Sequence, residues 1–225
     1  MIFARGSHLG DTAQVAPFMR GYYPSAIPDR DTDQETLARD ALALVEALGA
    51  GESVIIGHDW GASAAYGAAA LSPQRVKKLI VIGIPHPAAL KPSPRKIWNV
   101  RHVVAYKLPS APKRFARNDF AALPAVYRRW APTWVPKYEE SNAVRASFSH
   151  PESLNAAFGY YRKLSPRLPA WLKTGIAVPT VVFAGLDRRA AHMFGNEYIV
   201  EEVRGGHFMH REHPEAFAER LLTHL

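Results

Sequence analysis

The sequence predicts an α/β protein with a mostly parallel sheet, flanked by helices and interrupted by one helical insertion. Short apolar runs alternate with helical patterns towards both ends of the chain. The middle, residues 88–172, lacks this alternation and consists of short aromatic helical pieces separated by prolines. The chain has 225 residues, of which 48% are hydrophobic and 21% charged, and this composition excludes disordered and collagen-like proteins.

Local patterns predict the elements that precede the insertion. These are a strand at 13–18, a helix at 32–48, a strand at 53–57, a helix at 61–71 and a strand at 78–84. The first helix starts with the capping-box spacing of Thr32 and Glu35 and ends at Gly49. The second helix is dominated by Ala and Gly, whose small side chains allow it to lie close against a sheet.

The insertion contains helical pieces at 115–130 and 153–164, and strands return at 178–184 and 198–203. Pro214 opens a last helix that carries Phe217, Leu221, Leu222 and Leu225 on one side. We therefore predict a core of residues 1–87 and 173–225 around an insertion of residues 88–172.

The formal charge of +8 is concentrated in the middle of the chain. Residues 91–173 hold 16 Lys or Arg and 4 Asp or Glu, so the other residues carry 12 basic and 16 acidic side chains, a net charge of −4. A basic patch could meet nucleic acid, anionic lipid or an acidic substrate. These basic residues are scattered among prolines and aromatics without a nucleic-acid motif, so we expect a solvated surface and no nucleic acid partner.

Composition limits the remaining classes of function. The absence of Cys excludes disulfides, thiolate metal sites and a catalytic thiol, and it fits a reducing compartment. We see no bilayer-spanning apolar run and no leader peptide, and expect a soluble cytoplasmic protein. His207, His210 and His213 have a spacing that suggests metal ligands, but no carboxylate joins them and Pro214 breaks the segment, so no metal is expected.

Asp59 is the candidate nucleophile, at the centre of Gly57-His58-Asp59-Trp60-Gly61, between a predicted strand and the alanine-rich helix. A nucleophile elbow needs this context, because its tight turn requires small flanking residues and lifts the central residue above the sheet. A carboxylate is ionised near neutral pH and needs no base before it attacks. Its natural target is a saturated carbon with a leaving group, and the resulting alkyl ester must later be hydrolysed by water.

His207 is the predicted base for that hydrolysis. It follows Gly205-Gly206 after the last predicted strand, where two glycines let the backbone set an imidazole over the carboxyl end of the sheet. Asp187 ends the strand at 178–184 and offers a carboxylate to orient the imidazole. The order Asp59, Asp187, His207 is nucleophile, acid, base.

These segments resemble the α/β-hydrolase-fold proteins of the epoxide hydrolase and haloalkane dehalogenase group. The resemblance rests on the elbow from Gly57 to Ala62, on Ile84-Pro85-His86-Pro87 and on Gly205-Gly206-His207-Phe208, and it covers residues 14–225. It implies an α/β-hydrolase fold in which residues 88–172 form a helical cap that closes over the nucleophile. It also implies a hydrolase that needs no cofactor and acts on a small apolar substrate, an epoxide or a halide.

The resemblance assigns substrate contacts within the cap. The segment Phe158-Gly159-Tyr160-Tyr161-Arg162 resembles the one in which epoxide hydrolases carry a ring-opening tyrosine, and the match falls on Tyr161. Alternatively, Tyr160 and Tyr161 are ordinary packing residues. A second tyrosine is expected ahead of Leu108-Pro109, where we assign His102, which could donate a hydrogen bond in its place.

Trp60, Pro85 and His86 are the candidate oxyanion or pocket residues. Trp60 would wall the pocket beside Asp59 and could hold a halide with its indole N–H; alternatively, it is only a large hydrophobic residue beside the elbow.

Three departures from the family pattern affect these expectations. Only 19 residues separate Asp187 from His207, and an Asp common before Arg20 is absent from the segment at 16–22 that resembles the fourth strand of the family. The third strand and the His-Gly-x-Pro loop after it, which supplies one oxyanion N–H, have no counterpart before Gln14. We therefore expect the strand at 13–18 to pair directly with that at 53–57, or unpaired backbone groups, and a longer natural product with an upstream strand.

Three functions remain open at this point: an epoxide hydrolase acting through an Asp59 ester, a haloalkane dehalogenase, and a catalytically weak or non-enzymatic relative that binds small molecules. A homodimer is also left open.

Overall fold

The structure is a computed structural model that describes residues 2–6, 14–27, 31–89, 101–165, 167–183 and 188–225. The chain forms two compact units. The sheet unit comprises residues 1–17, 34–90 and 166–225, and the helical unit comprises residues 18–33 and 91–165. Within the described residues, no helix has the length and apolar character needed to cross a bilayer.

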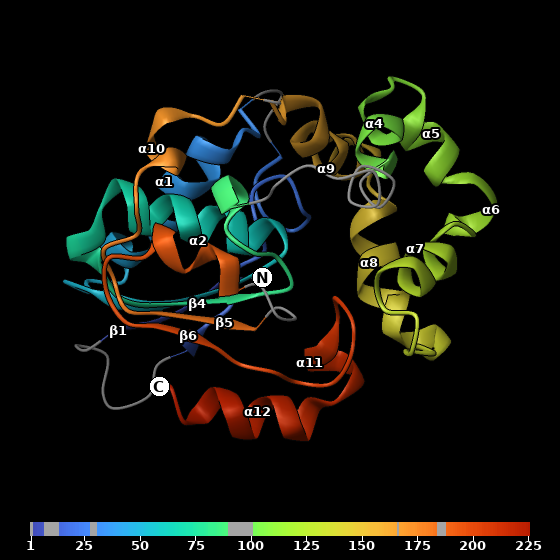
Figure 1. The fold of residues 1–225 in the computed structure, drawn as a ribbon. Coiled ribbons are helices and arrows are strands. Elements are labelled where there is room, and N and C mark those ends of the chain that lie inside the picture. The colour runs from blue at the N-terminus through green and yellow to red at the C-terminus, as the bar shows by residue number, and fades with distance from the viewer. Residues whose placement is uncertain (1, 7–13, 28–30, 90–100, 166, 184–187) are drawn as a thin grey trace. The chain divides into compact units, whose positions relative to one another are not determined.

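The sheet unit contains a six-stranded sheet with the order β2-β1-β3-β4-β5-β6 (Figure 1). The strands are β1 (Ile2–Gly6), β2 (Gln14–Val15), β3 (Ser53–His58), β4 (Val76–Ile82), β5 (Thr180–Phe183) and β6 (Tyr198–Val200). The four strands from β3 to β6 are parallel, whereas β1 is antiparallel to both β2 and β3. The predicted α/β fold with a mostly parallel sheet is therefore confirmed.

The structure corrects our expectation for the strand at 13–18. This strand is reduced to β2, and β1 lies between β2 and β3. Ile2 pairs with Gly57 and Gly6 pairs with Ser53, so the backbone groups along this side of β3 are paired. Because β1 runs antiparallel to β3, its carboxyl end lies at the start of β3, away from the elbow.

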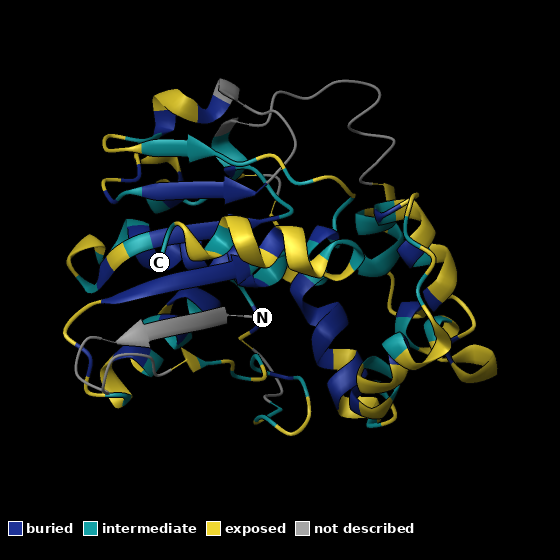
Figure 2. Cartoon of the chain, turned by 90° about the horizontal axis from the view of Figure 1, so that it is seen from below, coloured by how far each residue is buried: buried dark blue, intermediate teal, exposed yellow. Residues whose placement is uncertain are grey.

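Helices cover both faces of this sheet. Figure 1 shows α1 (Gln34–Ala47) and α2 (Trp60–Leu71) on one face and α12 (Pro214–Leu222) on the other. Strand side chains alternate between the faces, and those facing α12 form one core cluster with the short helix α11 (Met209–Glu212). The cluster consists of Val54, Ile56, Ile80, Ile82, Val181, Phe183, Met209 and Phe217. β3 is almost continuously buried and β4 is buried from Leu79 onwards, as expected for inner parallel strands (Figure 2).

Short helical turns connect the remaining parts of the sheet unit. They are the 3-10 helices η2 (Pro73–Arg75), η3 (Pro87–Ala89) and η5 (Arg188–Met193), and the α-helix α10 (Ala170–Lys173).

The described part of the helical unit consists of helices and loops. The helices are α4 (Arg101–Lys107), α5 (Ala111–Phe115), α6 (Arg117–Phe120), α7 (Leu123–Trp130), η4 (Tyr138–Ser141), α8 (Asn142–Phe148) and α9 (Pro151–Lys163). Aromatic rings hold them together in edge-to-face and tilted pairs, such as Phe115 with Phe158 and Phe120 with Phe148.

Residues 18–33, which the sequence placed in the core, cluster instead with the helical unit. Side chains of α9 explain the difference: Ser153 Oγ donates to the carbonyl of Gly21 and accepts from the amide of Tyr23. The hydroxyl of Tyr160 donates to the carbonyl of Arg20 at 2.5 Å. These bonds join a loop to a helix more than 100 residues away in the sequence, and no local sequence pattern predicts them.

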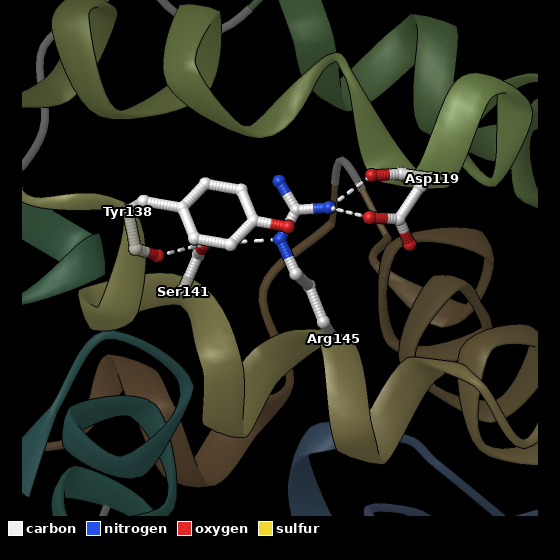
Figure 3. A network of polar contacts seen from close by, with 4 residues as sticks. All are labelled: Asp119, Tyr138, Ser141 and Arg145. Atoms are coloured by element: carbon white, nitrogen blue, oxygen red, sulfur yellow. Dashed lines mark hydrogen bonds and ion pairs between the residues drawn. The ribbon is translucent and has the colours of Figure 1, made fainter.

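Arg145 of α8 holds a strained turn in the helical unit (Figure 3). Asp119 and its two neighbours in the sequence have φ values of 51° to 59°, in the left-handed region that non-glycine residues seldom adopt. The guanidinium of Arg145 donates to the carbonyl of Asp119 and, at 2.5 Å, to its carboxylate. It also donates to Ser141 Oγ and lies 4.8 Å from the centre of the Tyr138 ring. Because the guanidinium group of Arg145 is planar and carries several N–H donors, it makes these bonds at once, and they offset part of the strain in the turn.

Arg145→Lys is expected to destabilise the protein by about 1–2 kcal/mol, because an ammonium keeps the charge but cannot make the same set of hydrogen bonds as the planar guanidinium. Thermal unfolding measures this loss. Arg128→Lys is the matched control, since Arg128 is an exposed residue of the same unit, and it is expected to change stability by less than about 0.5 kcal/mol. Equal melting temperatures for the two variants would show that the guanidinium of Arg145 does not stabilise the turn at Asp119.

Candidate active site

The turn between β3 and α2 sets the direction of Asp59. This residue has φ 53° and ψ −119°, a conformation that costs a non-glycine residue free energy and persists only where the surroundings impose it. The surroundings here are two backbone segments in close contact: a Cβ atom on Gly57 would lie 2.3 Å from the carbonyl oxygen of Gly61. The turn thus has the tight geometry of the predicted elbow, which requires small residues at positions 57 and 61.

The carboxylate of Asp59 is held at both oxygens. Its Oδ1 accepts a hydrogen bond from the amide of Trp60 at 2.8 Å, and its Oδ2 lies 2.9 Å from Nε2 of His207. Burial raises the pKa of Asp59, but the hydrogen bond and charge of His207, the charge of His58 and the Trp60 amide outweigh it and lower the pKa to about 2. Asp59 is therefore ionised throughout the neutral range.

His207 approaches Asp59 from the loop between β6 and α11. Its Nδ1 lies 3.3 Å from the carbonyl oxygen of Gly83, the residue that follows β4. Gly83 has φ 81°, and a Cβ atom there would lie 2.8 Å from Nδ1 of His207. Gly83, at the end of β4, therefore makes room for the imidazole of His207 and contacts it. The sequence analysis did not predict this contact.

Asp187, the predicted orienting acid, lies outside the described residues. The described partner of the Nδ1 side of His207 is the carbonyl of Gly83.

His86 is fully buried in the sheet unit, in the turn that Pro85 opens after β4. Its Nδ1 accepts from the amide of Ala88 at 3.2 Å, and its ring forms T-shaped pairs with those of Tyr66 and Phe194. Its Nε2 has no hydrogen-bond partner among the described residues. Burial, and then the charge of His192, lower the pKa of His86 to about 4, so the ring is neutral at pH 7.

The predicted proton donors belong to the helical unit. Tyr161 of α9 and His102 of α4 have ring centres 6.4 Å apart. Tyr106, which the sequence analysis did not select, is closer to Tyr161, with ring centres 5.0 Å apart, and burial raises its pKa despite the charge of Arg129. Its position two residues before Leu108 was the signal that could have selected it, since a tyrosine was expected there.

In the described part of the chain, no three His, Cys, Asp or Glu side chains are grouped as metal ligands.

Comparison with known proteins identifies the family. A model described as the alpha/beta hydrolase family matches residues 5–220. The chain belongs to the alpha/beta hydrolase family.

Several curated relatives of this alpha/beta hydrolase are named epoxide hydrolases. Mouse epoxide hydrolase 4 is 29% identical over 168 residues, which make up 69% of this chain and 46% of the relative. The AB hydrolase superfamily protein YfhM of Bacillus subtilis is 26% identical over 227 residues, 94% of this chain and 79% of that protein. The solved structure of epoxide hydrolase CorEH has the same fold, with a TM-score of 0.78 and 22% identity over 91% of this chain and 78% of CorEH. The resemblance to an epoxide hydrolase-like hydrolase is thus confirmed at the level of the family.

Gly83→Ala is expected to destabilise this alpha/beta hydrolase by about 1–3 kcal/mol, because alanine would strain the positive φ and press against His207. Thermal unfolding provides the measurement. Gly195→Ala is the control, since the nearest atom to a Cβ there is 3.9 Å away. An unaffected Gly83→Ala variant would contradict the close contact between β4 and the imidazole.

Acid should destabilise the fold in two steps. The first step comes from His58, His86 and His210. Burial, together with neighbouring charges, lowers the pKa values of these histidines from 6.5 to about 3, 4 and 4 respectively. The unfolded chain binds protons at these sites below pH 6.5 and the folded chain does not, so stability is greatest above that pH and falls as the pH drops towards 3. Asp59 adds a second loss as the pH falls from 3.8 to about 2, because its folded pKa is depressed.

Melting temperatures from about pH 8 to pH 4 test the first step. Each histidine contributes at most about 1.4 kcal/mol per pH unit within its window. His86→Phe removes one of the three groups and is expected to flatten the profile below pH 6.5. A profile that stays level down to pH 4 would refute the assignment.

Proposed function

We propose that this alpha/beta hydrolase opens epoxides through a covalent ester on Asp59 and hydrolyses that ester with water activated by His207. The observation that carries the proposal is the state of Asp59: an ionised carboxylate on a strained elbow, with one oxygen bound by the Trp60 amide and the other 2.9 Å from an imidazole nitrogen. Such a carboxylate suits attack on a saturated carbon, because it needs no base to activate it.

The proposed reaction has two chemical steps. In the first, Asp59 Oδ2 forms a bond to an epoxide carbon, the carbon–oxygen bond of the ring breaks, and the resulting alkoxide takes a proton from a phenol. In the second, His207 removes a proton from water, and the hydroxide formed attacks Cγ of the ester. The Trp60 amide already binds Oδ1, where charge develops in this step, and so stabilises the tetrahedral intermediate. Collapse of the intermediate breaks the Cγ–Oδ2 bond, and the departing alkoxide takes the proton of the added hydroxyl, which releases the diol and restores the Asp59 carboxylate. The proton held by His207 then returns through solvent to the phenolate left by the first step, so the imidazole and the phenol are restored as well.

The proton donor of the first step is proposed from the family resemblance to be Tyr161. Its neighbour Tyr160 has its hydroxyl committed to the carbonyl of Arg20, so it serves packing within the helical unit. Tyr106 is the added candidate for the second tyrosine, in place of His102. The roles of Asp187 as orienting acid and of the helical unit as substrate-selecting cap belong to the same proposal.

The test is intact-protein mass spectrometry on single active-site variants. His207→Gln is expected to gain the mass of an epoxide substrate and retain it, because alkylation does not need the base but hydrolysis does. Asp59→Ala is expected to gain no mass. If His207→Gln gains no mass from any substrate that the parent turns over, the covalent mechanism is wrong.

Aryl epoxides and haloalkanes are assayed side by side for diol and halide. Diol formation alone supports the epoxide hydrolase assignment. Halide release without diol would make the protein a dehalogenase, and tight binding without turnover of either would make it a non-enzymatic relative.

Tyr161→Phe is expected to slow epoxide opening by about tenfold or more while leaving halide release nearly unchanged, since a departing halide needs no proton. Initial rates on matched epoxide and halide substrates measure this difference. Tyr160→Phe is the control, because it loses a hydroxyl from the adjacent position without favouring one substrate. Equal losses on both substrates in Tyr161→Phe would mean that Tyr161 only shapes the pocket.

A further inference from the structure

His58, the last residue of β3, lies between two other histidine rings. Its ring centre is 4.6 Å from that of His207 and 4.5 Å from that of His210, on α11. Phe208 lies beside it, with ring centres 5.7 Å apart. The residue that precedes the candidate nucleophile is therefore in direct contact with the segment that carries the candidate base.

The main polar contact of His58 is with the backbone of His207. Its Nε2 lies 2.9 Å from the carbonyl oxygen of His207, across 149 residues of sequence. A carbonyl oxygen only accepts, so Nε2 carries the proton. Burial, followed by the charges of His207 and His210, lowers the pKa of His58 to about 3, although Asp59 and the carbonyl act in the opposite direction. The ring is thus neutral at pH 7, with its single proton donated to His207.

The imidazole of His207 contacts Asp59 and the carbonyl of Gly83, but the other described hydrogen bonds of the segment's backbone are local. Gly206 donates to Glu212 Oε2 at 3.0 Å, and the amide of Met209 donates to the carbonyl of Gly206 at 3.1 Å. These bonds fix the shape of the loop but join it only to its own continuation in α11. The bond from His58 differs, because it ties the backbone of His207 to the strand that carries Asp59.

We propose that His58 is a positioning residue that sets the distance between His207 and Asp59 by holding the carbonyl of His207. This inference rests on the proposed function, in which alkylation needs only Asp59 and ester hydrolysis needs both residues in register. Loss of the bond therefore slows the hydrolysis step selectively, because a shift of about 1 Å in a catalytic group can cost on the order of a hundredfold in rate.

The variants are chosen to separate the hydrogen bond from packing. His58→Phe keeps a ring of similar size and removes the donor, whereas His58→Gln keeps an N–H at a similar reach. If His58→Phe does not fold, His58→Asn replaces it, because its amide is too short to reach the carbonyl. His210→Phe is the matched control, since His210 packs on the same ring and its Nδ1 is buried without a hydrogen-bond partner among the described residues.

The experiment follows both steps in a single turnover by quenching the reaction and weighing the intact protein. His58→Phe is expected to slow ester hydrolysis by about ten- to a hundredfold, so that the ester accumulates, while alkylation changes by less than about threefold. His58→Gln should recover most of the hydrolysis rate, and His210→Phe should retain it. A parallel loss in both steps, no recovery in His58→Gln, or the same defect in His210→Phe would each overturn the positioning role.

A second readout does not depend on turnover. Amide hydrogen exchange at Gly206, His207 and Phe208 is expected to accelerate in His58→Phe and to remain normal in His58→Gln. If the parent forms no ester with any substrate, the proposed function is wrong, and exchange alone then decides the role of His58. Unchanged exchange in His58→Phe would overturn the positioning role even if the proposed function stands.

Discussion

The close approach of Gly57 to Gly61 is the constraint on which the described site depends. Only a residue without a Cβ atom allows β3 and α2 to meet at this distance, and the chain between them must then pass through the left-handed conformation of Asp59. That conformation costs on the order of 1–3 kcal/mol and persists because β3 is paired on both sides and α2 is buried along most of its length. The turn also puts the Trp60 amide beside Oδ1 and leaves Oδ2 facing His207.

The parallel arrangement of β3 and β4 brings the other parts of the site to the same edge of the sheet. Asp59 follows β3 and Gly83 follows β4, and the carboxyl ends of neighbouring parallel strands are adjacent. His207 lies against both, near Asp59 on its Nε2 side and near the Gly83 carbonyl on its Nδ1 side. His58 and His210 remain neutral at pH 7 because burial lowers their pKa values, so they add shape around His207 without adding charge.

The sequence predicted the features that local patterns control. Apolar runs and glycine punctuation located β3, α2 and β4 within a few residues, and the elbow motif identified Asp59. The missed features depend on contacts between distant segments. β1 owes its place to pairing with residues about 50 positions later, and residues 18–33 join the helical unit through bonds to α9. His58 was passed over because its significance lies in what it touches, which spacing alone does not reveal, whereas Tyr106 was overlooked although it stands just ahead of Leu108.

The direction of β1 has a practical consequence for protein production. Ile2 pairs with Gly57, so a tag placed directly before β1 would emerge beside the elbow, close to Asp59. Near the other end of the chain, Lys78 in the first half of β4 donates to the carbonyl of His224 at 2.7 Å. A tag placed after His224 therefore starts from a backbone anchored near the start of β4, at the opposite end of the strands from Asp59, and purification and immobilisation handles belong there.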